Sequence, residues 1–169
     1  MKAISTVDYV DLDRFMGDWY VIANIPTFIE TDAFNAVESY AMNEDGTIKT
    51  TFTFRKGGFA GDLKQYNPTG FIRDKQSNAL WDMQFIWPFK AEYRVIYLDS
   101  EYDITIIGRS KRDYVWIMAR TPEISDEVYQ ALLNFIAEQG YDTSQVQKVP
   151  QKWNQSHLEF NPSIYRGKV

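Results

Sequence analysis

The stretch Phe15-Met16-Gly17-Asp18-Trp19-Tyr20 decides the fold of this chain. It follows a predicted short helical turn at residues 11–14 and opens an apolar run at residues 21–25 with the composition of a strand. The glycine permits a tight turn, and the tryptophan two residues later is a large side chain that needs burial. Taken alone, the stretch is equally consistent with two interpretations. The tryptophan is either a large plug carried inward at the start of the first strand or an ordinary buried tryptophan that follows a turn.

The length and composition of the chain indicate one globular domain with an unusually aromatic interior. A chain of 169 residues can bury a sizeable core. Aromatic residues make up 16% of it, so we expect a wide core, an interface or a binding cavity to accommodate them. The net charge of -5 argues against nucleic acid as a partner, because phosphate contacts require a basic face. The basic cluster Arg109, Lys111 and Arg112 is interpreted as a solvated hairpin turn, with an anionic-headgroup site as the alternative.

The chain offers few residues for catalysis or metal binding. It has no cysteine, and its single histidine is His157 near the C-terminus. Thiolate nucleophiles, histidine-based triads and multi-histidine metal sites are therefore excluded, and no phosphate-binding glycine loop occurs. We predict no catalytic residues, no metal and no cofactor. Glu38 and Asp82 are the strand carboxylates that could approach a cavity, but we expect both on a solvated outer face.

Short alternating segments separated by turns follow the first strand. In residues 48–55, Ile48, Thr50, Phe52 and Phe54 alternate with polar or charged residues, which is typical of a sheet with one wet face. Similar segments are expected near residues 36–42, 63–73, 81–85, 93–97, 102–107 and 114–120. Residues 63–73 should bend at Pro68, which cannot donate to a strand ladder. About eight strands at ten-residue spacing predict a barrel or a sandwich.

One helix is predicted after the strands. Ser125 is a suitable N-cap, Gly140 a suitable stop, and one face carries a mostly apolar stripe of Val128, Leu132, Phe135, Ile136 and Gln139. This stripe should pack on the outside of the sheet, and residues 145–149 could add an edge strand. We divide the chain into an N-terminal extension (1–10), a barrel with its helix (11–153) and a polar tail (154–169).

The order of these motifs resembles the lipocalin family, and within it the bacterial branch that includes apolipoprotein-D-like proteins. Gly17-Asp18-Trp19 stands where lipocalins carry Gly-x-Trp, and Arg120 stands where they carry a final arginine. Residues 100–102, Ser-Glu-Tyr, match the middle motif only in the acidic residue type and the tyrosine. Residues 112–128 look specifically like the bacterial branch. The resemblance covers residues 8–153.

The resemblance implies an all-β fold: an eight-stranded antiparallel up-and-down β-barrel with one C-terminal α-helix packed outside. It also implies that the barrel binds, transports or sequesters a small hydrophobic or amphiphilic ligand such as a fatty acid or lysophospholipid, without being an enzyme. The alternative is an enzyme or a haem- or pigment-binding protein built on the same barrel. A small interior filled by its own side chains is the competing structural interpretation.

The candidate ligand-binding residues, at the cavity wall and its mouth, are mainly the inward-facing aromatic and methionine residues. They are Phe28, Phe34, Tyr40, Phe52, Phe54, Phe71, Trp81, Met83, Phe85, Tyr93, Tyr97, Trp116 and Met118. Gly17, Trp19 and Arg120 are assigned a structural role at the closed end. The hydroxyl groups of Tyr40, Tyr93, Tyr97 and Tyr102 are candidates for contact with a ligand headgroup. Strand parity places Arg94 outward, and the direction of Arg73 stays open.

Partners and location are inferred from the first long loop, the corner at residues 87–89 and the N-terminus. Phe28 and Phe34 lie in the first long loop, where they could form a lid, contact a membrane surface or tuck into the barrel rim. The bulky corner at residues 87–89 could support a homodimer. Residues 1–7 do not have the pattern of a signal peptide, and no run is long enough to span a membrane. We expect a periplasmic or outer-membrane-associated protein if an export segment has been removed, and a cytoplasmic protein otherwise.

Overall fold

The structure is a computed structural model that describes residues 2–153 of the chain. These residues form the short helix α1 (Leu12–Phe15), the longer helix α2 (Asp126–Glu138), the 3-10 helix η1 (Thr143–Gln145) and ten strands. The strands are β1 (Gly17–Ile25), β2 (Ala33–Met42), β3 (Ile48–Lys56), β4 (Leu63–Tyr66), β5 (Thr69–Ile72), β6 (Leu80–Ile86), β7 (Phe89–Leu98), β8 (Ile104–Gly108), β9 (Val115–Ala119) and β10 (Gln147–Lys148).

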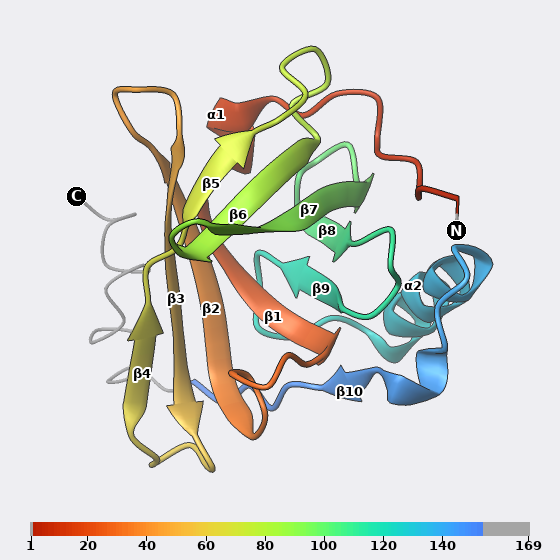
Figure 1. The fold of residues 1–169 in the computed structure, drawn as a ribbon. Coiled ribbons are helices and arrows are strands. Elements are labelled where there is room, and N and C mark those ends of the chain that lie inside the picture. The colour runs from red at the N-terminus through yellow and green to blue at the C-terminus, as the bar shows by residue number, and fades with distance from the viewer. Residues whose placement is uncertain (1, 154–169) are drawn as a thin grey trace.

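Eight of the strands close into an antiparallel barrel, which confirms the predicted fold class (Figure 1). The order is β1-β2-β3-β5-β6-β7-β8-β9, and β9 pairs back with β1. Two strands lie outside this circle. β4 pairs with β3. β10 pairs with Ala23 and Asn24, near the C-terminal end of β1, as the predicted edge strand. The predicted bend is the gap between β4 and β5, where the carbonyl oxygen of Pro68 accepts a hydrogen bond from the Thr50 amide at 3.2 Å.

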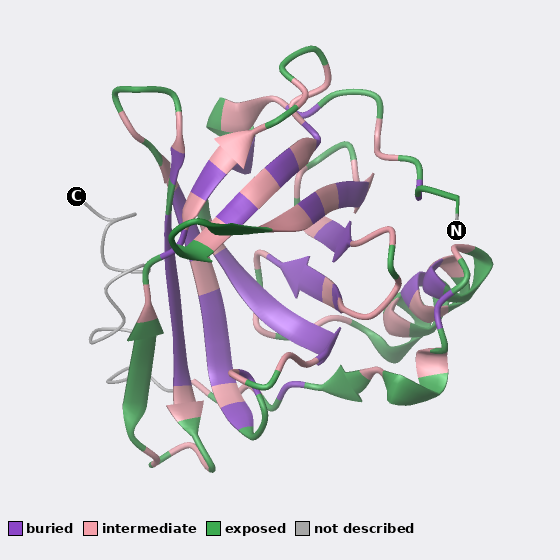
Figure 2. Cartoon of the chain, viewed as in Figure 1, coloured by how far each residue is buried: buried purple, intermediate pink, exposed green. Residues whose placement is uncertain are grey.

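The alternation of side chains divides the buried residues into an inner and an outer cluster. Residues of the inner cluster point into the barrel, and residues of the outer cluster lie between the barrel wall and α2. Figure 2 shows the buried positions along the barrel strands and on α2. Four irregularities interrupt the register of the barrel strands: between Val21 and Ala23, between Phe34 and Val37, between Met83 and Ile86, and between Val95 and Tyr97. Each one shifts the side chains that follow it to the other face of the sheet.

Helix α2 forms as the sequence predicts and covers the outer cluster. The Ser125 hydroxyl caps it by accepting a hydrogen bond from the Val128 amide at 3.1 Å. Leu132 and Ile136 are buried, while Val128 at the start of the stripe is partly exposed. Gly140 ends the helix with a φ of +96°, a conformation that L side chains rarely adopt.

The meander places alternate connections at opposite ends of the barrel. Helix α1 covers one end, which we call the closed end, together with the connections at residues 43–47, 73–79 and 99–103. The other end, which we call the mouth, carries the connections at residues 26–32, 57–62, 87–88 and 109–114. The N-terminal extension packs against the wall, since Ile4 and Val10 are buried and the Val7 amide donates to the Val95 carbonyl at 2.9 Å. The predicted polar tail at residues 154–169 lies outside the described residues.

Candidate ligand-binding site in the barrel

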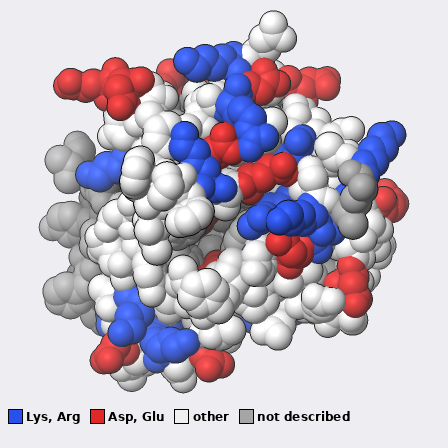
Figure 3. Space-filling model, in the orientation of Figure 1, with Lys and Arg blue, Asp and Glu red and all other residues white. Residues whose placement is uncertain are grey.

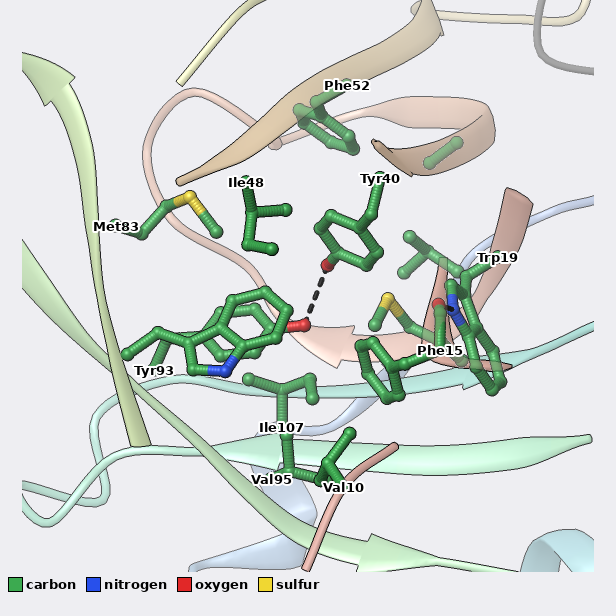
Figure 4. Packing of buried hydrophobic residues seen from close by; sticks show 14 of the residues in the cluster. Val10, Phe15, Trp19, Tyr40, Ile48, Phe52, Met83, Tyr93, Val95 and Ile107 are labelled. Atoms are coloured by element: carbon green, nitrogen blue, oxygen red, sulfur yellow. Dashed lines mark hydrogen bonds between the residues drawn. The ribbon is translucent and has the colours of Figure 1, made fainter. Parts of the chain in front are cut away.

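At the closed end, Trp19 is fully buried beneath the guanidinium group of Arg120. The guanidinium carbon lies 3.7 Å from the centroid of the indole ring, and the indole nitrogen donates to the carbonyl oxygen of Phe15 at 2.9 Å. Gly17 begins β1 with a φ of +96°, which explains the need for glycine there. Phe15 from α1 lies between this pair and the interior, where its ring packs against Tyr40 (Figure 4).

Arg120 joins three segments that are distant in sequence. Its guanidinium donates to the carbonyl oxygens of Arg14, Met16 and Asp18 at 2.8, 3.0 and 2.8 Å, and to that of Tyr102 at 3.2 Å. Burial lowers the pKa of Arg120 to about 10, so the side chain stays charged at neutral pH. The three sequence motifs therefore meet at one point and fix the closed end.

Most of the predicted lining residues do face the interior. The inner cluster contains Tyr40, Phe52, Phe54, Trp81, Met83 and Tyr93, with Trp116 packed against it and Met118 buried in it (Figure 4). Their rings form an ordered wall: Trp81 and Tyr93 stack with centroids 4.5 Å apart, and Phe52 and Phe54 lie 5.3 Å apart. In the orientation of Figure 1, a hollow is visible near the centre of the surface, below the β6–β7 hairpin, with acidic atoms at its edge (Figure 3).

The structure corrects the assignment of Phe71 and Tyr97 to the cavity. Phe71 lies opposite Asp82 on the outer face of the barrel, and the Lys90 amine sits 4.1 Å from its ring centroid. Because the chain bends before β5, the alternation of the preceding residues does not predict whether Phe71 faces inward or outward. Tyr97 packs against Phe135 of α2, because the irregularity between Val95 and Tyr97 moves it to the outer face.

Tyr102, Arg73 and Arg94 also lie outside the cavity. Tyr102 lies at the closed end, where its hydroxyl accepts a hydrogen bond from the Asp11 amide at 2.9 Å. Arg73 forms an ion pair with Asp82 on the outer face of β5 and β6, which answers the open question about its direction. Arg94 points outward as expected and pairs with Glu92 at 2.7 Å. Figure 3 shows acidic and basic side chains mixed on the surface over β5–β7.

The expectation for Glu38 is wrong, because its side chain points into the barrel. Its cross-strand partners on β1 and β3 are Trp19 and Phe52, and both are buried residues of the inner cluster. The signal was available in the sequence: Glu38 and Tyr40 are two residues apart in one strand and so share a face. The general preference of carboxylates for solvent obscured it. Asp82 does lie on the outer face, as expected.

Glu38, Tyr40 and Tyr93 form a hydrogen-bonded chain inside the barrel. The Tyr40 hydroxyl donates a short hydrogen bond to Oε2 of Glu38. The hydroxyl oxygens of Tyr40 and Tyr93 are 2.8 Å apart (Figure 4). Burial raises the pKa of the Glu38 carboxyl to about 7, and the hydrogen bond from Tyr40 opposes this shift. The pKa values of both tyrosines are raised well above their ordinary value by burial and by the nearby Glu38 charge.

A second buried carboxylate, Glu30, holds the first loop at the mouth. It accepts hydrogen bonds from the Thr27 amide and hydroxyl at 2.9 Å each and from the Trp116 indole nitrogen at 2.8 Å. Burial raises its pKa, and these donors oppose the shift. Sequence reasoning missed Glu30, since no pattern in the loop distinguishes it from the exposed Asp32 nearby. Its role in the structure is to tie residues 26–32 to the inner wall.

Large apolar side chains are exposed around the mouth. In the first loop, Phe28 is 86% exposed, while Phe34 tucks into the rim against Phe59 with ring centroids 5.1 Å apart. Trp87 and Phe89 in the β6–β7 hairpin are 81% and 76% exposed. Other exposed rim residues are Leu63, Phe85 and Ile86. Phe28 and Phe85 therefore lie at the mouth, and Phe34 lies beside it rather than over it.

The comparisons with known proteins agree with this geometry. Residues 10–151 match the family model described as a lipocalin-like domain. The chain is a lipocalin. It is 31% identical over 162 residues to temperature-induced lipocalin-1 of Arabidopsis thaliana, covering 89% of this chain and 84% of that protein. It is also 31% identical over 145 residues to the outer membrane lipoprotein Blc of Escherichia coli K12, covering 85% of this chain and 80% of the relative. The recognised family and its bacterial relatives are confirmed.

A solved structure supports the same fold. Insecticyanin from the tobacco hornworm Manduca sexta aligns with a TM-score of 0.69 at 15% identity, covering 91% of this chain and 86% of insecticyanin. Lipocalins bind small hydrophobic ligands and are in general binding or transport proteins. Within residues 2–153, no helix is long and apolar enough to cross a bilayer. The same residues contain no group of three or more potential metal ligands placed to hold an ion.

Proposed function

We propose that this lipocalin carries or sequesters a single-chain amphiphile, of the class that includes fatty acids and lysophospholipids, inside its barrel. The observation that supports this most directly is the aromatic inner wall around Phe52, Phe54, Trp81 and Trp116. An apolar chain placed against it gains about 0.8 kcal/mol for each CH₂ group removed from water. An eight-stranded barrel is wide enough for one such chain.

The two ends of the barrel differ, and this difference determines where a ligand can enter. Arg120 and Trp19 seal one end, so a ligand enters from the mouth. The exposed Phe28, Trp87 and Phe89 at the mouth would rest in the interfacial region of a membrane while a lipid is loaded or released. This supports peripheral membrane contact, with a homodimer through residues 87–89 as the second interpretation of the same apolar surface.

The relatives bear on where this function operates. Blc of Escherichia coli is an outer membrane lipoprotein by name, and the present chain covers most of it. We place this lipocalin in the periplasm or at the outer membrane if it is exported, and in the cytoplasm otherwise. Fractionation of cells that express the full natural gene product tests this assignment.

The decisive experiment is to identify what co-purifies with the protein. Purified protein is extracted with organic solvent, and the extract is analysed by mass spectrometry. We expect a lipid in near-stoichiometric amount. Ala91 lies opposite Met83 in the inner wall near the mouth, so Ala91→Trp should narrow the interior and reduce the bound lipid. Ala137→Trp, at an exposed position of α2, is the matched control and should retain it.

Two results would contradict the proposal. If both variants and the unaltered protein yield equal traces of lipid, the lipid binds outside the barrel. If the purified protein instead absorbs strongly in the visible range and the extract holds a pigment, the pigment-binding alternative replaces lipid carriage.

A further inference from the structure

The chain of Glu38, Tyr40 and Tyr93 offers hydrogen-bond acceptors rather than donors to the barrel interior. Because the single hydroxyl proton of Tyr40 is donated to Glu38, the proton in the Tyr40–Tyr93 hydrogen bond must come from Tyr93. With Glu38 ionised, both tyrosine protons are therefore in use. What remains for a ligand is a lone pair on the Tyr93 oxygen and the second carboxylate oxygen of Glu38.

The second oxygen of Glu38, Oε1, is open to the interior. It accepts no hydrogen bond from residues 2–153. Glu38 keeps some accessible surface although Trp19 and Phe52, which flank it on the neighbouring strands, are buried on the inner face. That accessible surface therefore faces the barrel interior. A desolvated carboxylate oxygen without a donor is costly, and a ligand that supplies the donor removes the cost.

Within residues 2–153, no basic side chain forms an ion pair with this carboxylate. The ion pairs among the described residues involve Asp82, Glu92, Asp113 and Asp126, and none involves Glu38. The charged group that affects the ionisation of Glu38 is another carboxylate, Glu30, which raises its pKa. Glu30 already accepts hydrogen bonds from Thr27 and Trp116, so it adds negative potential but little free acceptor capacity. The inner surface is electrostatically complementary to a cation.

We propose that the barrel selects lipophilic amines, which enter with the ammonium group first and donate hydrogen bonds to Glu38 and Tyr93. The apolar body of such a molecule lies along the aromatic wall toward the mouth. A fatty-acid carboxylate at the same depth has no proton to donate and is repelled by Glu38. This inference rests on the proposed lipid-binding function and narrows it to a headgroup class.

The pH dependence follows from the groups that face Glu38. These are Tyr40 on its own strand, Tyr93 on β7 and Glu30 in the first loop, whereas the flanking Trp19 and Phe52 do not titrate. Between pH 6 and 8 both tyrosines stay protonated and an alkylamine stays charged, since its pKa is close to the value of about 10.4 for lysine. Ionisation of Glu38 therefore strengthens amine binding as the pH rises through this range.

The test compares decylamine, decanol and decanoate, which share one chain and differ in headgroup. Each displaces the neutral fluorophore N-phenyl-1-naphthylamine from delipidated protein at pH 8. We expect decylamine to bind at least about tenfold more tightly than decanoate, in line with a hydrogen bond to a charged group. Glu38→Gln, which retains an acceptor for Tyr40, should weaken decylamine about tenfold and change decanol by less than about threefold. Glu44→Gln, at an exposed turn, is the matched control and should change neither.

The outcomes separate this inference from the proposed function. Tighter binding of decanoate than decylamine, or an unchanged preference in folded Glu38→Gln, would overturn the amine assignment while leaving lipid binding intact. Decylamine affinity that does not rise from pH 6 to 8 in the unaltered protein would also overturn it. If the fluorophore and decanol both fail to bind, the barrel takes no lipophilic ligand, and the proposed function fails together with this inference.

Discussion

The guanidinium group of Arg120 stacks on the indole ring of Trp19 at 3.7 Å and donates hydrogen bonds to the carbonyl oxygens of Asp18, Met16 and Arg14. One side chain, directly after the last barrel strand β9, thus holds the backbone at the start of the first strand, β1. Because the carbonyl groups of Asp18 and Met16 are partly buried, they have no ready replacement donor if the arginine is removed. We interpret this relationship as structural rather than ligand-binding.

Arg120→Ala should lower the free energy of unfolding by about 2 kcal/mol or more, from the lost cation–π contact and charged hydrogen bonds. For a domain of this size that corresponds to a fall in melting temperature of roughly 4–8 °C, measurable by calorimetry. Arg120→Lys keeps the charge but loses the planar guanidinium group with its several donors. We therefore expect its melting temperature to lie between those of Arg120→Ala and the unaltered protein. An unchanged melting temperature with weakened lipid binding would contradict the structural role.

The raised pKa of Glu38 links stability to pH. The carboxyl titrates near 7 in the folded protein and near its ordinary value of about 4.5 when unfolded, so the folded state binds more protons between these values. The contribution of Glu38 to stability is fully present below pH 4.5 and is lost as the pH rises through 7. Its size is at most about 3 kcal/mol, with solvent access from the interior reducing it.

Glu38→Gln removes this titration. We expect the ligand-free variant to be more stable than the unaltered protein at pH 8 and to lose that advantage at pH 5, as measured by urea unfolding at both values. Glu44→Gln again serves as the control. An equal difference in stability at the two pH values would show that Glu38 titrates normally in the fold.

Glu30 is expected to control the order of the first loop. Glu30→Ala removes the acceptor for the Thr27 amide and leaves the Trp116 indole without its partner. Hydrogen exchange at the Thr27 amide should accelerate by about tenfold or more, while exchange in α2 is unchanged. Asp32→Asn, in the same loop but exposed, should leave the Thr27 amide protected. Equal acceleration in both variants would assign the order of the loop to some other contact.

The exposed rim predicts membrane partitioning. Trp87→Ser and Phe28→Ser should each reduce binding to phosphatidylcholine vesicles by about tenfold, because each removes a large apolar side chain from the membrane interface. Val128→Ser, which is partly exposed on α2 away from the mouth, is the control. Unaltered partitioning would remove the membrane interpretation.

Sedimentation of the same variants tests the dimer, which Trp87→Ser should dissociate if residues 87–89 form its interface.

The sequence by itself determined the barrel and its closed end. Period-two alternation at ten-residue spacing predicts a sheet with one buried face, as in a barrel or a sandwich. The resemblance of Gly17, Trp19 and Arg120 to the lipocalin motifs then implied the barrel and its closed end. These features depend on local geometry and on residue type, both of which can be read along the chain. Helix α2 followed in the same way from its cap, its apolar stripe and Gly140.

The tertiary structure decided which polar and aromatic side chains meet inside. An irregularity of one residue in β7 moved Tyr97 to the outer face, and the bend before β5 did the same for Phe71. Glu38 lies inside because strand pairing fixes its face beside Trp19 and Phe52, whatever its own preference for solvent. Register is set by contacts between strands, so the acceptor chain of Glu38, Tyr40 and Tyr93 exists only once the barrel has closed.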